Sequence, residues 1–193
     1  MPRNGDEAID IESIKNLIPA YAKDLKLNIS SVLTAEGSPG LTKTQILATA
    51  YASSIAARNS ELRRHFEKLA MAELPPNQLN AAQAAASIMA MNNIYYRATH
   101  MLSNTEYLKM QAKLRMNVIA NPGVDKVDFE IYSLAVSAIN GCGMCLSAHE
   151  AVVRKAEITA EGVQSALRIA AVLHGLAVAI EAGSPAQSKR QAA

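Results

Sequence analysis

The sequence predicts an all-α protein, and three observations support this fold class. Apolar residues recur at helical spacing through most of the 193 residues, and no segment shows the sustained alternation of a β-strand. Half of the residues are hydrophobic, but aromatic residues make up only 4%, tryptophan is absent and there are eight methionines. A core of mainly aliphatic side chains suits closely packed helices, so we expect one helical domain.

Turn-forming residues separate the helices expected in the first half of the chain. Helical spacing from Ile11 to about Thr34 contains Pro19, which favours a break because proline lacks the N–H that a helix interior needs. The Gly-rich segment 36–40 is a turn, Asn59 and Ser60 can cap a helix, and Leu74–Pro76 ends it. We therefore expect helices at 11–34, 42–57, 61–73 and 78 to about 101.

The second half of the chain continues in the same pattern. A shorter helix is expected at 104–114, before a clear turn at Asn121–Gly123. Asp125 or Lys126 then starts a helix to about residue 140, and Gly141 interrupts the pattern. A helix is expected at about 142–156. A final helix, capped by Thr159, extends to residue 182. The helical domain thus covers 11–183, and the polar ends 1–10 and 184–193 are expected to be disordered.

Charge and hydropathy disfavour several classes of partner. The formal net charge is only +2 and is spread along the chain, so neither nucleic acid nor a charged membrane surface is favoured. The first residues lack the apolar core of a signal peptide, and no run of about 18 uninterrupted apolar residues indicates a membrane span. We expect a cytoplasmic protein.

The chain contains two cysteines, Cys142 and Cys145, which form a CxxC motif. No strand precedes the motif, so it does not fit the βαβ pattern of thioredoxin and is expected at the start of a helix. Unpaired amide groups and the positive end of the helix dipole stabilise a thiolate there. The spacing of three also places both sulfurs on one helix face, close enough to bridge. We interpret the pair as a redox site, and two small buried hydrophobic residues are the alternative.

Two further residues could move protons at such a site. His149 follows Cys145 by four residues and shares its helix face, so its imidazole can accept a proton from the thiol directly or through a water. Glu130 lies in the preceding helix, whose inward side is otherwise apolar, and a carboxylate there would be costly without a partner. We consider Glu130 a candidate to orient His149. An ordinary helix histidine and a solvent-facing glutamate are the alternatives.

A zinc site is the main competing interpretation of these residues. Cys142, Cys145, His149 and Glu130 could supply four ligands, because thiolate, imidazole and carboxylate all suit Zn²⁺. Structural zinc sites usually draw their ligands from two separated knuckles, and this chain has one. We therefore favour the redox interpretation.

Four blocks of the sequence resemble one known family. The segment Glu130–Glu150, which contains the CxxC and His149, closely resembles the active-site stretch of the alkyl hydroperoxidase D family, within the carboxymuconolactone decarboxylase-like superfamily. Tyr21–Asn28, Met89–Arg97 and Leu114–Gly123 are similar to further blocks of that family, in the same order. The resemblance spans about residues 11 to 183. A bare CxxC would be weak evidence, but four ordered blocks are specific.

The resemblance implies a fold, an activity and a set of partners. It implies an all-helical homotrimer without a metal or bound cofactor, which reduces alkyl hydroperoxides to alcohols and also reduces a partner peroxiredoxin. Dihydrolipoamide on a lipoyl-bearing acyltransferase of a 2-oxoacid dehydrogenase complex would supply the electrons. By position, Cys145 matches the cysteine that becomes the sulfenic acid and Cys142 the cysteine that resolves it to the disulfide. Glu130 and His149 match the proton relay.

One position departs from the pattern of the family. Relatives often have a histidine directly before the second cysteine, where this chain has Met144. If that histidine tunes the thiolate, we expect lower peroxidase activity here and a larger share of disulfide transfer to the peroxiredoxin. A superfamily relative that acts on a lactone or other small molecule by acid–base chemistry, with incidental thiols, is the alternative function.

Several other conspicuous residues are interpreted as packing. The methionines are expected in the core or at a subunit interface, and the Tyr95–Arg97 segment as a packed helix face, with a groove for a lipoyl group or partner as its alternative. The methionines concerned are Met89, Met91, Met110 and Met116.

Overall fold

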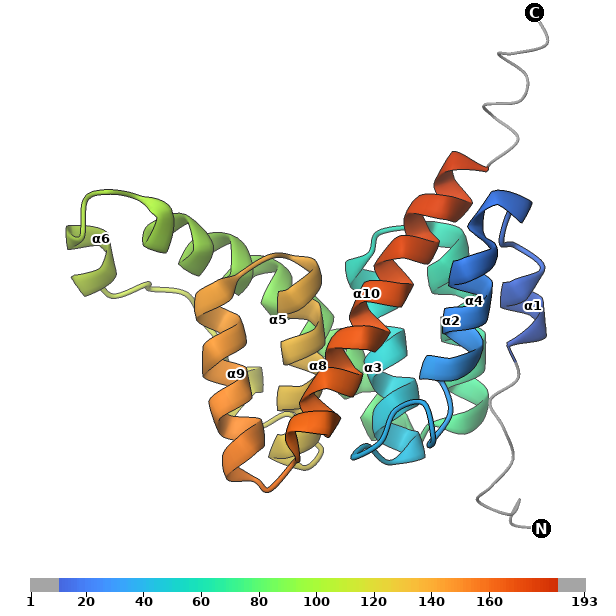
Figure 1. The fold of residues 1–193 in the computed structure, drawn as a ribbon. Coiled ribbons are helices and arrows are strands. Elements are labelled where there is room, and N and C mark those ends of the chain that lie inside the picture. Colours follow the sequence, from blue (N-terminus) through green and yellow to red (C-terminus); the bar gives the residue numbers. More distant parts are fainter. Residues whose placement is uncertain (1–10, 184–193) are drawn as a thin grey trace, which may run out of the picture.

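The computed structural model describes residues 11–183, and every regular element in that range is a helix (Figure 1). This confirms the all-α prediction. The segments expected to be disordered, 1–10 and 184–193, lie outside the described residues. In chain order the elements are α1 (Glu12–Lys15), the 3-10 helix η1 (Ala20–Ala22), α2 (Lys23–Val32), α3 (Lys43–Ala56), α4 (Ser60–Glu73), α5 (Pro76–Met101), α6 (Glu106–Lys109), α7 (Asn117–Ala120), α8 (Lys126–Ile139), α9 (Gly143–Lys155) and α10 (Ala160–Ala182).

The centre of the molecule is built around α8. This helix packs against α3, α5, α9 and α10, and its residues from Phe129 to Ser137 are all buried. In Figure 1, α10 crosses between one lobe with α1 to α4 and another with α8, α9 and the end of α5. Because this part of α8 is enclosed by its neighbours, a carboxylate such as that of Glu130 needs a partner inside the protein.

Two predicted caps fix the starts of the helices that they precede. Asn59 Oδ1 accepts hydrogen bonds from the N–H groups of Glu61 and Leu62, at 3.1 and 2.9 Å. Thr159 Oγ1 accepts one from Gly162 N–H at 3.1 Å. These bonds satisfy backbone donors that have no partner within the first helical turn, so local chemistry is enough to place both helix starts.

The helix expected at 104–114 is wrong. The structure has one turn, α6, followed by non-helical backbone to residue 116. Residues 101–111 are all exposed, so a longer helix would have no buried apolar face to stabilise it. In addition, α6 lacks a side-chain cap, and Lys113 has a φ of 52°, outside the right-handed helical region. Met110, expected in the core or at a subunit interface, is 65% exposed in the single chain.

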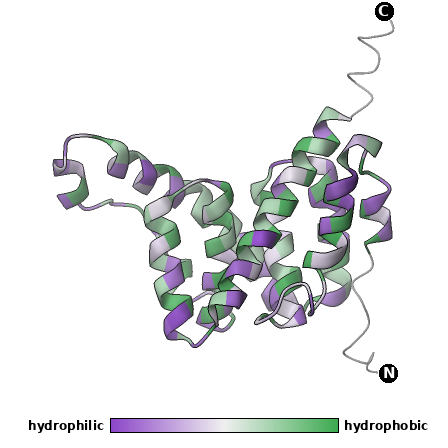
Figure 2. Cartoon of the chain, in the orientation of Figure 1, coloured by the Kyte–Doolittle hydropathy of each residue, from purple (hydrophilic) through white to green (hydrophobic). Residues whose placement is uncertain are grey.

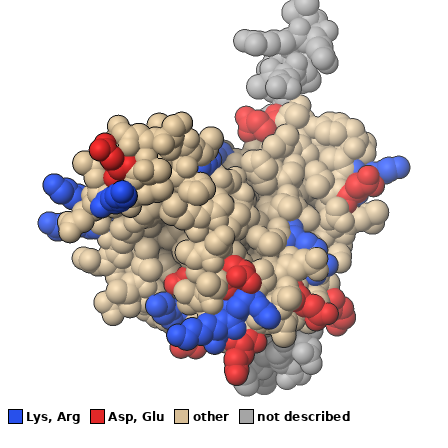
Figure 3. Space-filling model, turned by 60° about the vertical axis from the view of Figure 1, so that its left-hand side comes forward, with Lys and Arg blue, Asp and Glu red and all other residues tan. Residues whose placement is uncertain are grey.

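Hydrophobic and hydrophilic residues are intermixed along the helices, as in a helical bundle, and charged side chains lie on the surface (Figures 2 and 3). Within the described range, α10 is long and apolar enough to cross a membrane by length and composition, but 56% of its most apolar window is buried inside the bundle. That hydrophobicity is thus largely accounted for by contacts with α2, α3 and α8. In Figure 3, lysine and arginine lie near aspartate and glutamate around the edge of the face shown, without a large patch of one sign.

Candidate redox site

Cys142 and Cys145 are joined by a disulfide at the start of α9. Cys142 is the N-cap residue, and its Sγ accepts a hydrogen bond from Cys145 N–H at 3.3 Å. The Cα atoms are 5.3 Å apart, a normal distance for a disulfide. Cys142 is completely buried, whereas Cys145 is 7% exposed. The position of the CxxC at a helix start therefore agrees with the sequence prediction, and Cys145 is the more accessible of the two.

A polar network holds the turn before the cysteines. Gly141 has a φ of +68°, which a residue with a side chain would rarely adopt. Arg97 donates a hydrogen bond to the carbonyl of Asn140. The side chain of Asn140 donates to Asn93 Oδ1 at 2.9 Å, and Asn93 in turn donates to Ser137 Oγ at 2.9 Å. The end of α8 and the turn into the CxxC are thus tied to α5.

Glu130 and His149 form a buried pair between α8 and α9. His149 Nδ1 lies 2.6 Å from Glu130 Oε2, and the two residues are 9% and 4% exposed. The solvent-facing alternative for Glu130 is therefore wrong. The short contact gives the buried carboxyl its partner, fixes the orientation of the ring and provides a path for a proton between the two groups.

The second nitrogen of the imidazole faces a sulfur. His149 Nε2 lies 3.2 Å from Met89 Sδ, and Asn93 Nδ2 lies 3.9 Å from the same sulfur. Met89 is 1% exposed, as expected for core packing. Its contact with His149 was not predicted, since the two residues are 60 positions apart and methionine carries no pattern that indicates such a contact.

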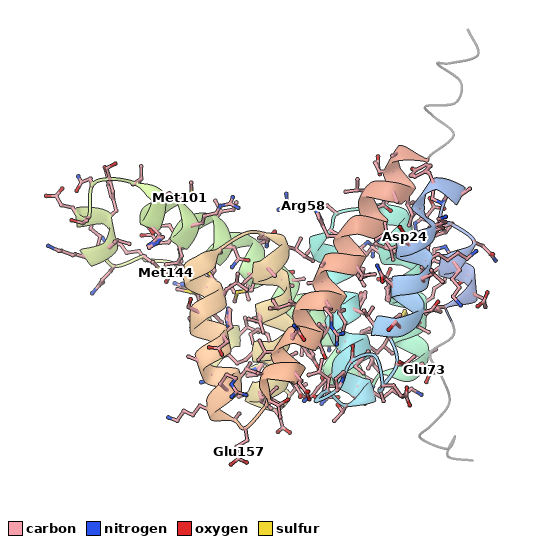
Figure 4. The ribbon with its side chains drawn as sticks, in the orientation of Figure 1. Asp24, Arg58, Glu73, Met101, Met144 and Glu157 are labelled. Atoms are coloured by element: carbon pink, nitrogen blue, oxygen red, sulfur yellow. A yellow bond between two sulfur atoms is a disulfide. The ribbon has the colours of Figure 1, made fainter. Side chains whose placement is uncertain are left out.

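A largely apolar cavity of about 270 Å³ opens beside Cys145 and His149. Met144 lies at the start of α9 (Figure 4) and belongs to its wall. Cys142 and Glu130 do not border the cavity, so of the two cysteines Cys145 is the one that a small molecule would meet there. Tyr96, interpreted as part of a packed helix face, borders it as well. The lining consists of Met89, Asn92, Tyr96, Met116, Ile119, Met144, Cys145, Ala148 and His149.

The four candidate residues are brought together in two pairs, a disulfide and an acid–imidazole contact. With the two sulfurs bonded to each other, no group of three or more His, Cys, Asp or Glu side chains within residues 11–183 is arranged to hold a metal ion. The arrangement can exchange two electrons through the sulfurs and a proton through the imidazole.

Asn92 also borders the cavity and was missed by sequence analysis. It is 4% exposed, and its Oδ1 has no hydrogen-bond partner among the described residues. Such a group is uncommon, because a buried amide without a partner is costly. The only signal in the sequence is its place at helical spacing between Met89 and Tyr96, which is also typical of an ordinary helix face.

Comparison with known proteins gives consistent matches. The Carboxymuconolactone decarboxylase family matches residues 105–187. Over 174 residues, or 90% of this chain, the sequence is 51% identical to the protein called alkyl hydroperoxide reductase AhpD of Brucella canis, of which it covers 98%. The proteins of the same name from Streptomyces coelicolor and Rhodopseudomonas palustris are 51% and 52% identical over the same length, with 96% and 94% of each covered.

Proposed function

The chain belongs to the alkyl hydroperoxide reductase AhpD family, and on that premise we propose that it is a thiol-dependent alkyl hydroperoxide reductase. The observation that carries this proposal is the position of Cys145. Its sulfur is paired with Cys142, borders an apolar cavity, and shares that cavity with an imidazole that is held by a buried carboxyl. An apolar cavity suits the alkyl part of an organic hydroperoxide.

These positions support a catalytic cycle with two chemical steps. The Cys145 thiolate attacks the terminal peroxide oxygen, the O–O bond breaks, and a proton carried by His149 and Glu130 leaves with the alcohol. The sulfur is oxidised to a sulfenic acid as the peroxide is reduced. Cys142 then condenses with the sulfenic acid, which forms the disulfide and releases water. Zinc plays no part in this cycle, and no bound cofactor is required.

Dihydrolipoamide is the proposed reductant of the disulfide. One thiolate of the lipoyl group attacks the more exposed sulfur, that of Cys145, and forms a mixed disulfide with it. The second lipoyl thiol then attacks the first lipoyl sulfur and releases Cys145. Two electrons and two hydrogens thereby pass to the cysteines. The lipoyl group would be carried by the acyltransferase of a 2-oxoacid dehydrogenase complex. The reduced pair would also reduce a partner peroxiredoxin in the cytoplasm.

A homotrimer is the proposed assembly. Large apolar side chains are exposed on the single chain at the end of α5 and around α6, which favours burial against another subunit. They are Met101, Leu102, Tyr107, Leu108 and Met110. Light scattering coupled to size-exclusion chromatography measures the mass directly, and a monomer at micromolar concentration would contradict this part of the proposal.

A coupled assay tests the proposed activity. The complete mixture contains NADH, lipoamide dehydrogenase, lipoamide, the protein and tert-butyl hydroperoxide, with and without the peroxiredoxin, and NADH consumption is recorded. We expect turnover that is abolished by Cys145→Ser and by Cys142→Ser. Absence of turnover in both mixtures would exclude the proposal, and NADH consumption that survives both substitutions would show that the two cysteines do not carry the electrons.

A further inference from the structure

Two neighbouring asparagines on α5 differ sharply in their surroundings. The side chain of Asn93 donates to Ser137 Oγ and accepts from Asn140 Nδ2, both at 2.9 Å, so its amide is used to hold α8. Asn92 is almost as deeply buried, yet its Oδ1 has no partner among residues 11–183. A buried amide in this condition destabilises a fold and calls for a functional explanation.

The position of Asn92 supplies that explanation. Met89, Asn92 and Tyr96 recur at helical spacing on one face of α5, and all three border the cavity beside Cys145 and His149. Three other buried side chains in the described range also lack a partner, but they are hydroxyls that do not border this cavity. These are Thr49, Ser53 and Ser133. Among the described residues, Asn92 is therefore the one with such an unpartnered atom that borders this cavity.

We propose, on the basis of the function proposed above, that Asn92 is a catalytic residue that binds the hydroperoxide group. A hydroperoxide carries one O–H donor and two oxygens that can accept, and a carboxamide offers an acceptor oxygen and two N–H donors. Asn92 Oδ1 accepts from the O–H, which turns the terminal oxygen towards Cys145 Sγ. The N–H group donates to the inner oxygen, which belongs to the leaving alcohol.

The bond changes show where this contact matters. Sulfur donates an electron pair to the terminal oxygen, the O–O bond breaks, and its electron pair stays on the inner oxygen until the relay supplies a proton. Sulfur loses two electrons and the peroxide gains them, giving the sulfenic acid and the alcohol. An N–H directed at the inner oxygen stabilises charge that develops only as the O–O bond breaks, and such contacts accelerate the chemical step.

Asn92→Leu is the decisive variant, because it removes the amide but keeps a side chain of similar size. Stopped-flow measurement of the reduced protein with tert-butyl hydroperoxide should show a rate at least about tenfold lower. The separate reaction of the disulfide form with dihydrolipoamide should change less than about twofold. The thermal midpoint should stay the same or rise, since an unpartnered polar group has been replaced by an apolar one.

Two further variants serve as controls for this result. Ile94→Leu changes a half-exposed residue of the same helix that does not border the cavity, and it should leave the peroxide rate within about threefold. Asn93→Leu removes an amide that has partners, so it should lower the thermal midpoint. If Asn92→Leu lowers the midpoint and slows both half-reactions equally, Asn92 is a packing residue and the proposal is wrong.

The unsubstituted protein provides a second measurement. In the ¹⁵N spectrum of the disulfide form, the side-chain NH₂ signals of Asn92 should shift on titration with tert-butanol, the product alcohol, while those of Asn93 stay in place. Absence of a shift at saturating alcohol would contradict binding by Asn92. An active protein whose rate is unchanged by Asn92→Leu would overturn only the role of this residue, whereas inactivity of the unsubstituted protein towards peroxide would overturn the proposed function itself.

Discussion

α8 carries two clusters of polar side chains that differ in how many of their polar atoms have hydrogen-bond partners. Near its start, Asp128 accepts from the amides of Gln45 and Gln78, both at 2.8 Å, and Tyr132 donates to Gln78 at 2.6 Å. Between Asp128 and Tyr132 in the sequence, Glu130 contacts His149, whose other nitrogen faces the sulfur of Met89. The first cluster is closed and joins three helices, whereas the second opens onto a cavity.

The difference separates polar groups that stabilise the fold from those available for chemistry. A closed network has strong partners on every side and resists rearrangement. A thioether is only a weak hydrogen-bonding group, so the imidazole can exchange its contact with Met89 for another at small cost. Substitutions in the first cluster, around Asp128, should therefore change the free energy of unfolding. Substitutions in the second cluster, around Glu130, should change the rate of peroxide reduction.

Within the two clusters, the largest effect is expected from Glu130→Gln. The amide keeps the size of the carboxyl and can still contact His149, but it cannot take up the proton, so the peroxide-dependent rate should fall about 100-fold. Thermal unfolding should change little. Glu150→Gln, at an exposed position next to His149, is the matched control and should retain the rate of the unsubstituted protein. Equal rates for the two variants would show that Glu130 is not part of a relay.

Asp128→Ala should have the opposite profile. It removes an acceptor shared by Gln45 and Gln78 and leaves the NH₂ groups of both without this acceptor, so the free energy of unfolding in urea should fall by about 2 kcal/mol. The rate constant per folded molecule should stay within about twofold. A large loss of rate without a loss of stability would mean that the two clusters are coupled.

A smaller effect is expected from Tyr132→Phe, about 1 kcal/mol of stability at pH 7. Burial, with a smaller contribution from the charge of Asp128, raises the pKa of Tyr132 above its ordinary value near 10. Above about pH 10 the folded protein therefore keeps the hydroxyl proton of Tyr132 while the unfolded chain loses it. The contribution of Tyr132 to the free energy of unfolding is complete below about pH 10 and declines as the pH rises further. Urea titrations between pH 8 and 11 should show a shallower alkaline decline for the variant than for the unsubstituted protein, and parallel curves would contradict this assignment.

The sequence was sufficient where local chemistry decides the structure. The caps at Asn59 and Thr159 and the helix start at Cys142 depend on residues within one helical turn of each other, and the structure has all three as predicted. The helix expected at 104–114 failed because its apolar residues have no surface of the same chain to pack against, and helical spacing alone cannot reveal this.

The site was predictable only in part. Cys145 and His149 lie one turn apart on the same helix, so their relation follows from spacing. Glu130 could be named as a candidate from its apolar surroundings and from the family pattern, but its contact with His149 depends on how α8 crosses α9. Met89 and Asn92 come from a helix about 60 residues earlier, and the long-range packing that brings α5 to the site has no local signature.

The cavity owes two of its lining residues, Met116 and Ile119, to the short segment between α6 and α8. Nothing from residue 101 to residue 120 is fully buried, while the chemical groups of the cavity come from α5 and α9 inside the bundle. Substitutions at these two positions can therefore reshape the space for the alkyl group without repacking the core or moving a sulfur. Selection for a different peroxide would find its most tolerant targets there, and a library limited to these two codons is a compact starting point for changing substrate preference.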